Sequence, residues 1–339
     1  MSIWYSFIRN YVRAGISLYF KQVRISGEEH IPTTGAVMFT VNHQNAFLDA
    51  LLVATTNKRH THFLVRADVF KFKPVRWFFA SLNMMPIYRI RDGRASLHQN
   101  HEIFEKCYGI LRERHALMLF PEANHHQQRF LLPLSKGFTR IALGLDAPIH
   151  IVPVGLNYTH HRRFGGSVSV NYGPPISSQP FLTGNPDFRG LRAKVGQQMQ
   201  QLITHIPNDS HYQHYEDYLN QDPVKYLEPE ACNQWLKETN PDSLPVAAVL
   251  PTPSLGKKLV RGCSWLLNFP PLVLCTWVLR KIGDPVFSSS IKFLTGIIVF
   301  PIYYLGLWVS LGFIYDFWIS SGLVVLAVLS LWMRKWALS

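Results

Sequence analysis

Short apolar runs and amphipathic stretches alternate along most of this chain, in the pattern of an α/β protein. Three runs predict buried strands, because they carry no acid, lysine or arginine and are too short for buried helices. They are Ala36–Val41, Ala116–Phe120 and Ile149–Val154. Helical patterns lie between or beside them, namely Ala46–Thr55, His98–Arg114 and Lys136–Leu143. Strands and helices at this spacing predict one α/β domain over residues 25–206.

Residues 1–24 have a helical period with a cationic stripe. Arg9, Arg13, Ser17 and Lys21 recur every fourth residue, and aromatic and aliphatic residues occupy much of the remaining surface. This pattern is typical of a helix that lies in a membrane interface. The alternative is a helix that packs on its own domain.

The last part of the chain, residues 259–339, is strongly apolar. Phe293–Ile314 and Phe317–Met333 are uncharged apart from their flanks and long enough to cross a hydrocarbon core of about 30 Å. A third apolar segment, Ser264–Leu279, contains two adjacent prolines and is predicted to be re-entrant or interfacial. Residues 207–258 are rich in acids and prolines and are predicted to be a surface linker with some helix.

The charges around the apolar pair predict its orientation. Lys292 precedes the pair, Arg334 and Lys335 follow it, and only Asp316 lies in the connection. The positive-inside rule then predicts a hairpin with both outer ends in the cytoplasm. We therefore expect an integral membrane protein with its α/β domain on the cytoplasmic face.

The composition of the 339-residue chain supports a membrane protein with anionic partners. Charged residues make up only 16%, against about 25% in a typical soluble domain. The formal net charge is +13, which favours phospholipid headgroups or phosphorylated ligands. The four cysteines are widely separated, and the paired histidines lack further ligands at metal spacing, so we expect no metal site. No nucleic-acid-binding signature accompanies the charge.

The first candidate for chemistry follows the strand that ends at Val41. His43 falls at the turn from this strand to the next helix, where α/β folds expose reactive groups. Asp49 lies early in that helix, so its carboxylate can reach the imidazole and fix its tautomer. The alternative is an Asn-His turn closed by a helix-capping aspartate.

Further polar residues follow the other apolar runs. Glu122 comes just after the run that ends at Phe120, and Arg129 and Lys136 lie downstream. Arg89 follows a shorter run at Met85–Ile87. A carboxylate with nearby cations suits an acceptor that bears hydroxyls and a phosphate, because a guanidinium matches phosphate with two parallel hydrogen bonds.

Together these motifs resemble the PlsC-type family of glycerolipid acyltransferases. That family has four blocks in order: Asn-His…Asp, an arginine block, Phe-Pro-Glu-Gly, and an apolar block around Pro-Val/Ile-Gly. Here they correspond to Asn42-His43…Asp49, Pro86–Arg89, Phe120–Ala123 and Val152–Gly155. The resemblance covers about residues 25–205 and implies a central mixed sheet flanked by helices.

Two departures from the family pattern stand out. Five residues lie between His43 and Asp49, where four are usual, and this gap resembles the branch with fungal glycerol-3-phosphate and dihydroxyacetone-phosphate acyltransferases. Ala123 replaces the usual glycine. If its backbone has a positive φ, we expect alanine to cost about 1 kcal/mol or more.

The resemblance implies direct acyl transfer in phospholipid synthesis. His43 would act as general base and Asp49 would orient it, while Asn42, Arg89, Glu122, Arg129 and Lys136 would bind substrate. The donor would be acyl-CoA or acyl carrier protein, and the acceptor glycerol 3-phosphate, its 1-acyl derivative or another lysophospholipid. No cofactor is expected, because a thioester is already activated. A lipid hydrolase or thioesterase, and a non-catalytic membrane-anchored module that binds anionic lipid, are the alternatives.

Overall fold

A single mixed sheet forms the centre of the protein. The computed structural model describes residues 2–88, 99–245 and 254–338. The strands are β1 (Gln22–Ser26), β2 (Val37–Val41), β3 (Thr61–Arg66), β4 (Met84–Ile87), β5 (Ala116–Leu119), β6 (His150–Tyr158), β7 (Ser167–Tyr172) and β8 (Ile176–Ser177). Their order is β1-β7-β6-β2-β5-β3-β4, and β8 pairs with β6. The strands from β6 to β4 are parallel, whereas β7 is antiparallel to β6. The predicted mixed sheet is confirmed.

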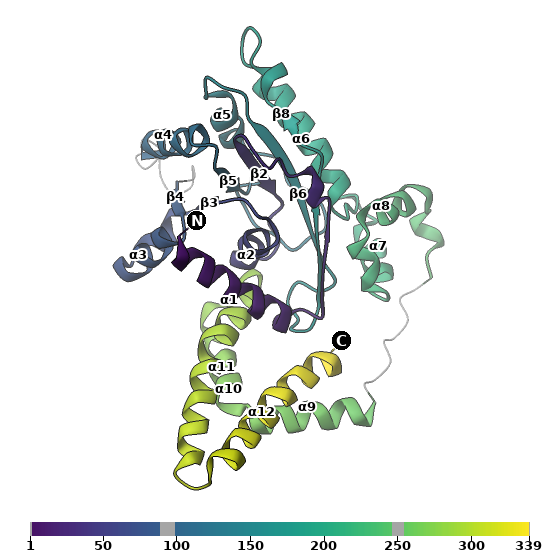
Figure 1. Cartoon of the computed structure of the whole chain (residues 1–339). Helices are drawn as coiled ribbons and strands as arrows, with labels where there is room; N and C mark the ends of the chain where they lie inside the picture. Colours follow the sequence, from purple (N-terminus) through teal and green to yellow (C-terminus); the bar gives the residue numbers. More distant parts are fainter. Residues whose placement is uncertain (1, 89–98, 246–253, 339) are drawn as a thin grey trace.

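Helices cover both faces of this sheet (Figure 1). One face packs on α1 (Ile3–Tyr19), α2 (Phe47–Thr56) and α3 (Lys73–Ser81). The other face packs on α4 (Gln99–Arg112), α5 (Gly137–Leu143) and α6 (Phe188–Leu202). Because strand side chains alternate between faces, Phe39 belongs to the first core and its neighbour Met38 to the second.

The glycine of the apolar block is explained by the packing of α6. A Cβ added to Gly155 would lie only 2.1 Å from the carbonyl oxygen of Leu202, at the end of this helix. Any larger residue would push α6 away from β6. The block therefore maintains a close approach between helix and sheet.

Helix α1 has three faces. Tyr5, Val12 and Ile16 are buried against the sheet domain, as the packed-helix alternative predicts. A second face exposes aromatic residues: Phe7 is 61% exposed and Trp4 is 43% exposed. The cationic stripe forms the third face. The helix thus packs on its own domain and still presents an apolar surface.

Residues 207–245 contain more structure than the predicted linker. They form α7 (Tyr212–Leu219) and α8 (Pro229–Glu238), and a small hydrophobic core of their own joins the two helices. The buried Tyr226 lies between them. These helices pack beside the sheet, next to the end of α6 (Figure 1).

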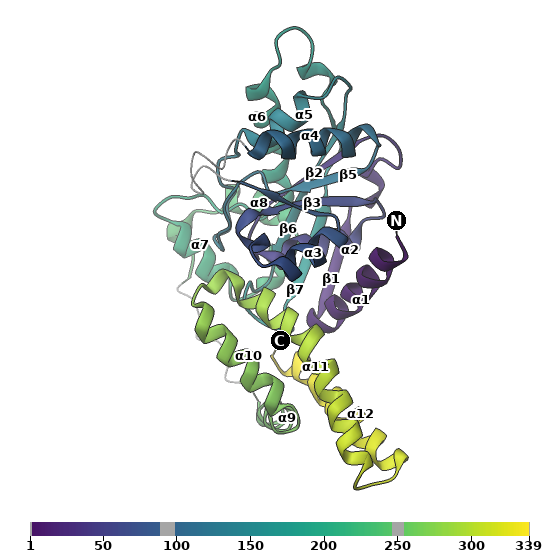
Figure 2. The same cartoon turned by 90° about the vertical axis from the view of Figure 1, so that its left-hand side faces the viewer.

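The C-terminal helices project from the face of the sheet that carries α1 and α2 (Figure 2). The segment Pro285–Gly312, which includes α11 (Ser288–Gly312), and α12 (Phe317–Leu338) are each long and apolar enough to cross a membrane. Before them, α9 (Leu255–Leu267) and α10 (Phe269–Ile282) meet at a bend of 92°. This bend falls within the segment that is predicted to be re-entrant or interfacial, and it is the geometry of a broken span or a re-entrant loop.

Candidate active site

The candidate site lies at the carboxyl ends of the parallel strands β2 and β5. These strands pair directly, with Thr40 opposite Leu119, so the turns that follow them are adjacent. The first turn carries His43 and the second carries Glu122. The main chain joins the two turns, since the N–H of His126 donates to the carbonyl oxygen of His43 at 3.2 Å.

His43 and Asp49 form the pair that the sequence predicts. His43 Nδ1 lies 2.9 Å from Asp49 Oδ2, and the carboxylate is fully buried. The same oxygen accepts the backbone N–H groups of Gln44 (2.9 Å) and Asn45 (2.7 Å). Asp49 therefore does two things at once: it closes the turn, as the alternative predicts, and it orients the imidazole. With Nδ1–H directed at the carboxylate, Nε2 is the nitrogen left for a substrate hydroxyl.

Tyr158 completes the environment of the carboxylate. It ends β6, and its hydroxyl donates to Asp49 Oδ1 at 2.6 Å. Burial and the neighbouring carboxylate raise the pKa of Tyr158 well above its usual value, so the hydroxyl remains a donor. Four donors thus stabilise one buried anion. No motif in the sequence singles out Tyr158, although it lies just beyond the Val152–Gly155 block on the strand next to β2.

Glu122 holds the backbone of the catalytic turn. Its Oε1 accepts the N–H of His43 at 2.8 Å, and its Oε2 accepts the N–H of Leu132 at 2.9 Å. His126 Nε2 lies 3.2 Å from Oε2, and Glu122 is only 5% exposed. Both oxygens are therefore used within the protein. The structure gives Glu122 a positioning role, in contrast to the predicted contact with substrate.

Asn42 also departs from its predicted role in substrate binding. Its side-chain amide donates to the carbonyl oxygen of Leu156 at 3.0 Å and accepts the N–H of Leu156 at 2.7 Å. Both polar atoms of this buried side chain extend the pairing of β2 with β6 beyond Val41. Asn42 thus fixes where the strand ends and the turn of His43 begins.

Arg129 is a buried cation that also lines a basic pocket beside the turn, so its predicted contact with substrate stays a prediction. It is 4% exposed and donates to the carbonyl oxygens of Tyr158 (2.9 Å) and Thr159 (3.3 Å). Its guanidinium also lies 3.2 Å from the centre of the Tyr226 ring. These contacts tie the end of β6 to the α7–α8 region. Burial lowers the pKa of Arg129, with partial compensation from the tyrosines around it.

The imidazole of His43 is enclosed by rings. Phe120 stacks on it with centroids 3.8 Å apart, and His125 meets it edge-on at 5.5 Å. His125 in turn contacts Phe287 and lies 3.8 Å from the carboxylate of Asp284, both in the connection between α10 and α11. The apolar C-terminal region therefore reaches the candidate site.

Two serines at the start of α11 support the catalytic turn, one directly and one through the main chain of His161. Ser290 Oγ donates to the carbonyl oxygen of Asn45 at 2.9 Å and accepts the N–H of Leu48 at 3.1 Å. Ser289 Oγ donates to the carbonyl oxygen of His161 at 2.6 Å, which also accepts the side-chain amide of Asn45. Ser290 is 3% exposed. The sequence gives no sign of this link, because some 240 residues separate the partners.

A basic pocket of about 490 Å³ lies beside the turn. Arg162, Arg163 and His160 line it, and Gln44 bridges from the turn to its wall by hydrogen bonds with Gln128 and His161. Burial and nearby arginines lower the pKa of His160 to about 4, so its ring is neutral at pH 7. The pocket owes its positive charge to the arginines and is suited to a phosphate group.

A second pocket, of about 680 Å³, lies at the sheet edge beside β4. It combines apolar residues such as Phe70 and Met85 with the cations Lys71, Arg76 and Lys106. The predicted Arg89 lies outside the described residues, immediately after Tyr88 in the pocket wall. Phe79 contacts both Phe47, next to the catalytic turn, and Phe70.

The remaining predicted residue, Lys136, is exposed and precedes α5. Its neighbour Ser135 donates from its backbone N–H to the carbonyl oxygen of Pro121 at 2.7 Å. Lys136 is therefore brought near the turn of Glu122. Ala123 in that turn has φ 56°, so the alanine in place of glycine does occupy a left-handed conformation.

Comparisons with known proteins find acyltransferases among the sequences similar to this chain. The sequence profile of the family described as Acyltransferase matches residues 22–157. Glycerol-3-phosphate O-acyltransferase 1 from Saccharomyces cerevisiae is 36% identical over 79 residues, 22% of this chain and 10% of that protein. The 1-acyl-sn-glycerol-3-phosphate acyltransferase from Limnanthes douglasii is 24% identical over 180 residues, 51% of this chain and 60% of that protein.

Among solved structures, the 1-acyl-sn-glycerophosphate acyltransferase PlsC from Thermotoga maritima is 21% identical with a TM-score of 0.45, covering 58% of this chain and 78% of that one. The match to the yeast relative covers only a tenth of its length. The profile, in contrast, spans the whole stretch from β1 to the end of β6, including His43, Asp49 and Glu122. Over the strands that carry the candidate site, the α/β domain of this chain is therefore similar to proteins of the Acyltransferase family.

Proposed function

We propose that the protein transfers a fatty acyl group from a thioester to a hydroxyl of glycerol 3-phosphate at a membrane. The observation that carries this proposal is the His43–Asp49 pair, in which Nε2 is left for an acceptor while Nδ1 is fixed by a buried carboxylate. Support for glycerol 3-phosphate comes from the five-residue gap and from the yeast relatives. The second candidate acceptor is 1-acylglycerol 3-phosphate, which the relative from Limnanthes douglasii favours.

The proposed reaction is a direct displacement. The acceptor hydroxyl gives its proton to His43 Nε2 as its oxygen bonds to the thioester carbonyl carbon. The carbon–sulfur bond then breaks, and the proton passes from Nε2 to the leaving thiolate. Asp49 stabilises the imidazolium that forms between these steps. The donor is acyl-CoA or acyl carrier protein, and the chemistry requires no covalent enzyme intermediate.

We place the acceptor phosphate in the basic pocket beside Gln44. Arg162 and Arg163 are exposed there and carry the charge that the pocket offers. The mixed apolar and cationic character of the second pocket favours the acyl chain of the donor or acceptor. Arg163→Ala should then raise KM for the acceptor about tenfold while kcat changes little, because a phosphate contact of this kind provides uniform binding.

We further propose that the domain lies on the cytoplasmic face of the membrane. The apolar face of α1, Phe72 just before α3 and Trp77 within α3 would enter the interface, and α11 and α12 would cross the bilayer. A 3.1 Å hydrogen bond from Trp4 Nε1 to Ser81 Oγ joins α1 to α3, so the exposed aromatic rings of the two helices form one surface. Reaction of single cysteines with an impermeant reagent in intact and opened vesicles tests this orientation. Labelling of residues 315–316 only from the side that bears α9 would contradict it.

The decisive experiment measures acyl transfer from labelled acyl-CoA, and then from acyl carrier protein, to a panel of acceptors. The panel contains glycerol 3-phosphate, 1-acylglycerol 3-phosphate, lysophospholipids and water alone. We expect one phosphate-bearing acceptor to be acylated by the native protein and by His101→Ala, whose exposed histidine is a control, but not by His43→Ala. Release of free fatty acid without an acceptor would indicate a thioesterase. The absence of product with every donor would favour a lipid-binding module.

A further inference from the structure

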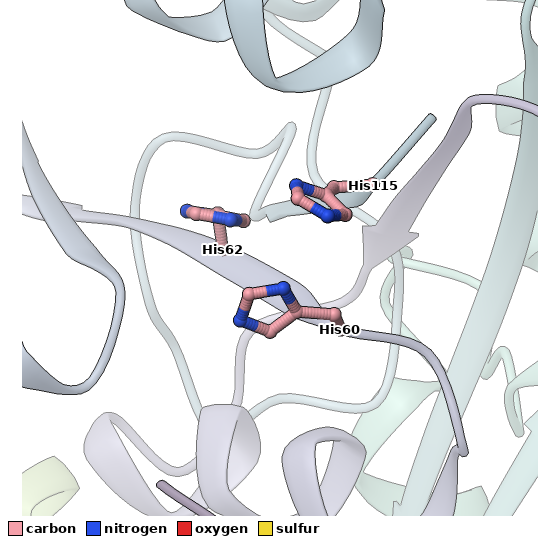
Figure 3. A group of neighbouring side chains, drawn as sticks. All are labelled: His60, His62 and His115. Carbon is pink, nitrogen blue, oxygen red and sulfur yellow. The ribbon is translucent and has the colours of Figure 1, made fainter. Parts of the chain in front are cut away.

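Three histidines meet at the end of the sheet opposite to the candidate active site. His60 and His115 directly precede β3 and β5, and the pairing of Thr61 with Ala116 in these parallel strands brings them side by side. His62 lies two residues further along β3, on the same face of the strand as His60. The three rings surround a common space (Figure 3). One nitrogen from each lies within 4.8 Å of the other two.

The ring nitrogens of this cluster are incompletely satisfied by the protein. His62 Nε2 and His115 Nδ1 are buried and have no hydrogen-bond partner among the described residues. Buried polar nitrogens are normally paired, so such atoms at one place call for an explanation. Glu113 Oε2 lies 3.4 Å from His115 Nδ1, close enough for ion pairing but not aligned as a hydrogen bond.

One ring of the cluster, His60, has a further contact of the kind that orients a histidine ligand. The Asn83 side chain lies 2.8 Å from His60 Nε2. A half-turn of this amide directs its oxygen at an Nε2–H and leaves the Nδ1 lone pair free. Metal-bound histidines commonly hold their other nitrogen against a carbonyl or carboxylate in this way.

We propose that His60, His62 and His115 bind a divalent transition-metal ion, with Zn²⁺ the best fit. Imidazole nitrogens suit this class of ion, and three histidines leave a fourth tetrahedral position for water or for the Glu113 carboxylate. Zn–N bonds of about 2.0–2.1 Å require the nitrogens to approach to about 3.3 Å. Rotation of the side chains provides that movement without any change in the paired strands.

The position of the ion indicates a structural role. The cluster lies at the amino ends of β3 and β5, whereas His43 follows the carboxyl end of β2, which runs parallel to them. The His60 ring also meets Tyr5 of α1 edge-on at 5.7 Å. A bound ion would therefore fix the start of two strands next to the N-terminal helix, and acyl transfer would not pass through it.

The test uses the full chain in detergent, stripped with EDTA and then titrated with Zn²⁺ alone. We expect one equivalent to bind to the native protein and to raise its Tm. His62→Ala and His115→Ala should each weaken this binding at least 100-fold and abolish the rise in Tm. His101→Ala, an exposed histidine on α4, should bind as the native chain does.

A second readout separates loss of ligation from loss of folding. Co²⁺ in place of Zn²⁺ should give the visible absorption of a tetrahedral nitrogen site. His115→Gln, whose side chain is polar and of similar size, should remove this absorption while acyl transfer continues. The proposal is overturned if the native protein binds no ion at the cluster. It is equally overturned if His62→Ala and His115→Ala bind Zn²⁺ as tightly as His101→Ala.

Discussion

The two ends of the sheet carry histidines in opposite chemical situations. At the carboxyl end, His43 has one nitrogen held by a buried carboxylate that itself accepts four donors. At the amino end, three rings share a space in which two buried nitrogens have no hydrogen-bond partner among the residues that the structure describes. The partners of a histidine therefore decide its chemistry. A carboxylate prepares one ring for proton transfer, whereas three rings that meet at one place offer their nitrogens to a cation.

The largest effect is expected when the buried negative charge beside His43 is removed. We expect Asp49→Asn to lower kcat about 10²–10⁴-fold, because the imidazolium of His43 loses its counter-charge and its tautomer is no longer fixed. Steady-state kinetics with the acceptor identified above measures this loss. Asp146→Asn, at an exposed turn, provides the matched control. Activity of Asp49→Asn within tenfold of the native value would refute the general-base assignment.

A smaller effect is expected where the apolar hairpin supports the catalytic turn. Ser290→Ala removes the hydroxyl that bridges Leu48 and Asn45, and the N–H of Leu48 keeps only the carbonyl oxygen of Asn45 as acceptor, which should destabilise the protein by about 1 kcal/mol. Loosening of the turn should also lower kcat about tenfold with little change in KM. Thermal unfolding in detergent and kinetics measure the two effects.

Ser288→Ala is the control for this experiment, since Ser288 starts the same helix and is less buried. Equal behaviour of the two variants would show that α11 merely anchors the domain. Loss of activity in Ser290→Ala alone would show that the hairpin helps to build the site.

The smallest effect is expected for a substitution that changes the free energy of unfolding and alters neither His43 nor the three-histidine cluster. Ala123 has φ 56°, so Ala123→Gly should stabilise the protein by about 1 kcal/mol and leave kcat unchanged. Chemical denaturation measures this gain. Ala193→Gly, in the exposed middle of α6, should instead cost about 0.5–1 kcal/mol. A loss of stability in Ala123→Gly would show that the turn itself is unstrained.

The sequence predicts the structure well where that structure depends on neighbours along the chain. The strand, turn and helix around His43 are continuous, so their pattern places the imidazole and Asp49 together. Roles set by distant partners were predicted less well. Glu122 was expected to bind substrate, yet both of its carboxylate oxygens accept hydrogen bonds from main-chain N–H groups of the protein, those of His43 and Leu132.

The same reason explains what the sequence did not reveal at all. Nothing near His60 in the chain indicates that His115 will lie beside it, because β4 and α4 intervene before β5 returns to the centre of the sheet. Residues 207–245 have an acidic, proline-containing composition typical of a linker, and only the joint core of α7 and α8 makes them part of the fold. Long-range pairing, rather than local propensity, carries this information.

The hydrogen bonds of Ser290, at the start of α11, also affect the depth of the catalytic turn relative to the bilayer. From Ser290 to Phe293, where the uninterrupted apolar sequence begins, the helix rises only about 4.5 Å. With α11 across the bilayer, the turn of His43 would be held at the level of the headgroups. A lipid acceptor would then present its hydroxyl without leaving the membrane, and the new ester would already lie at its final depth.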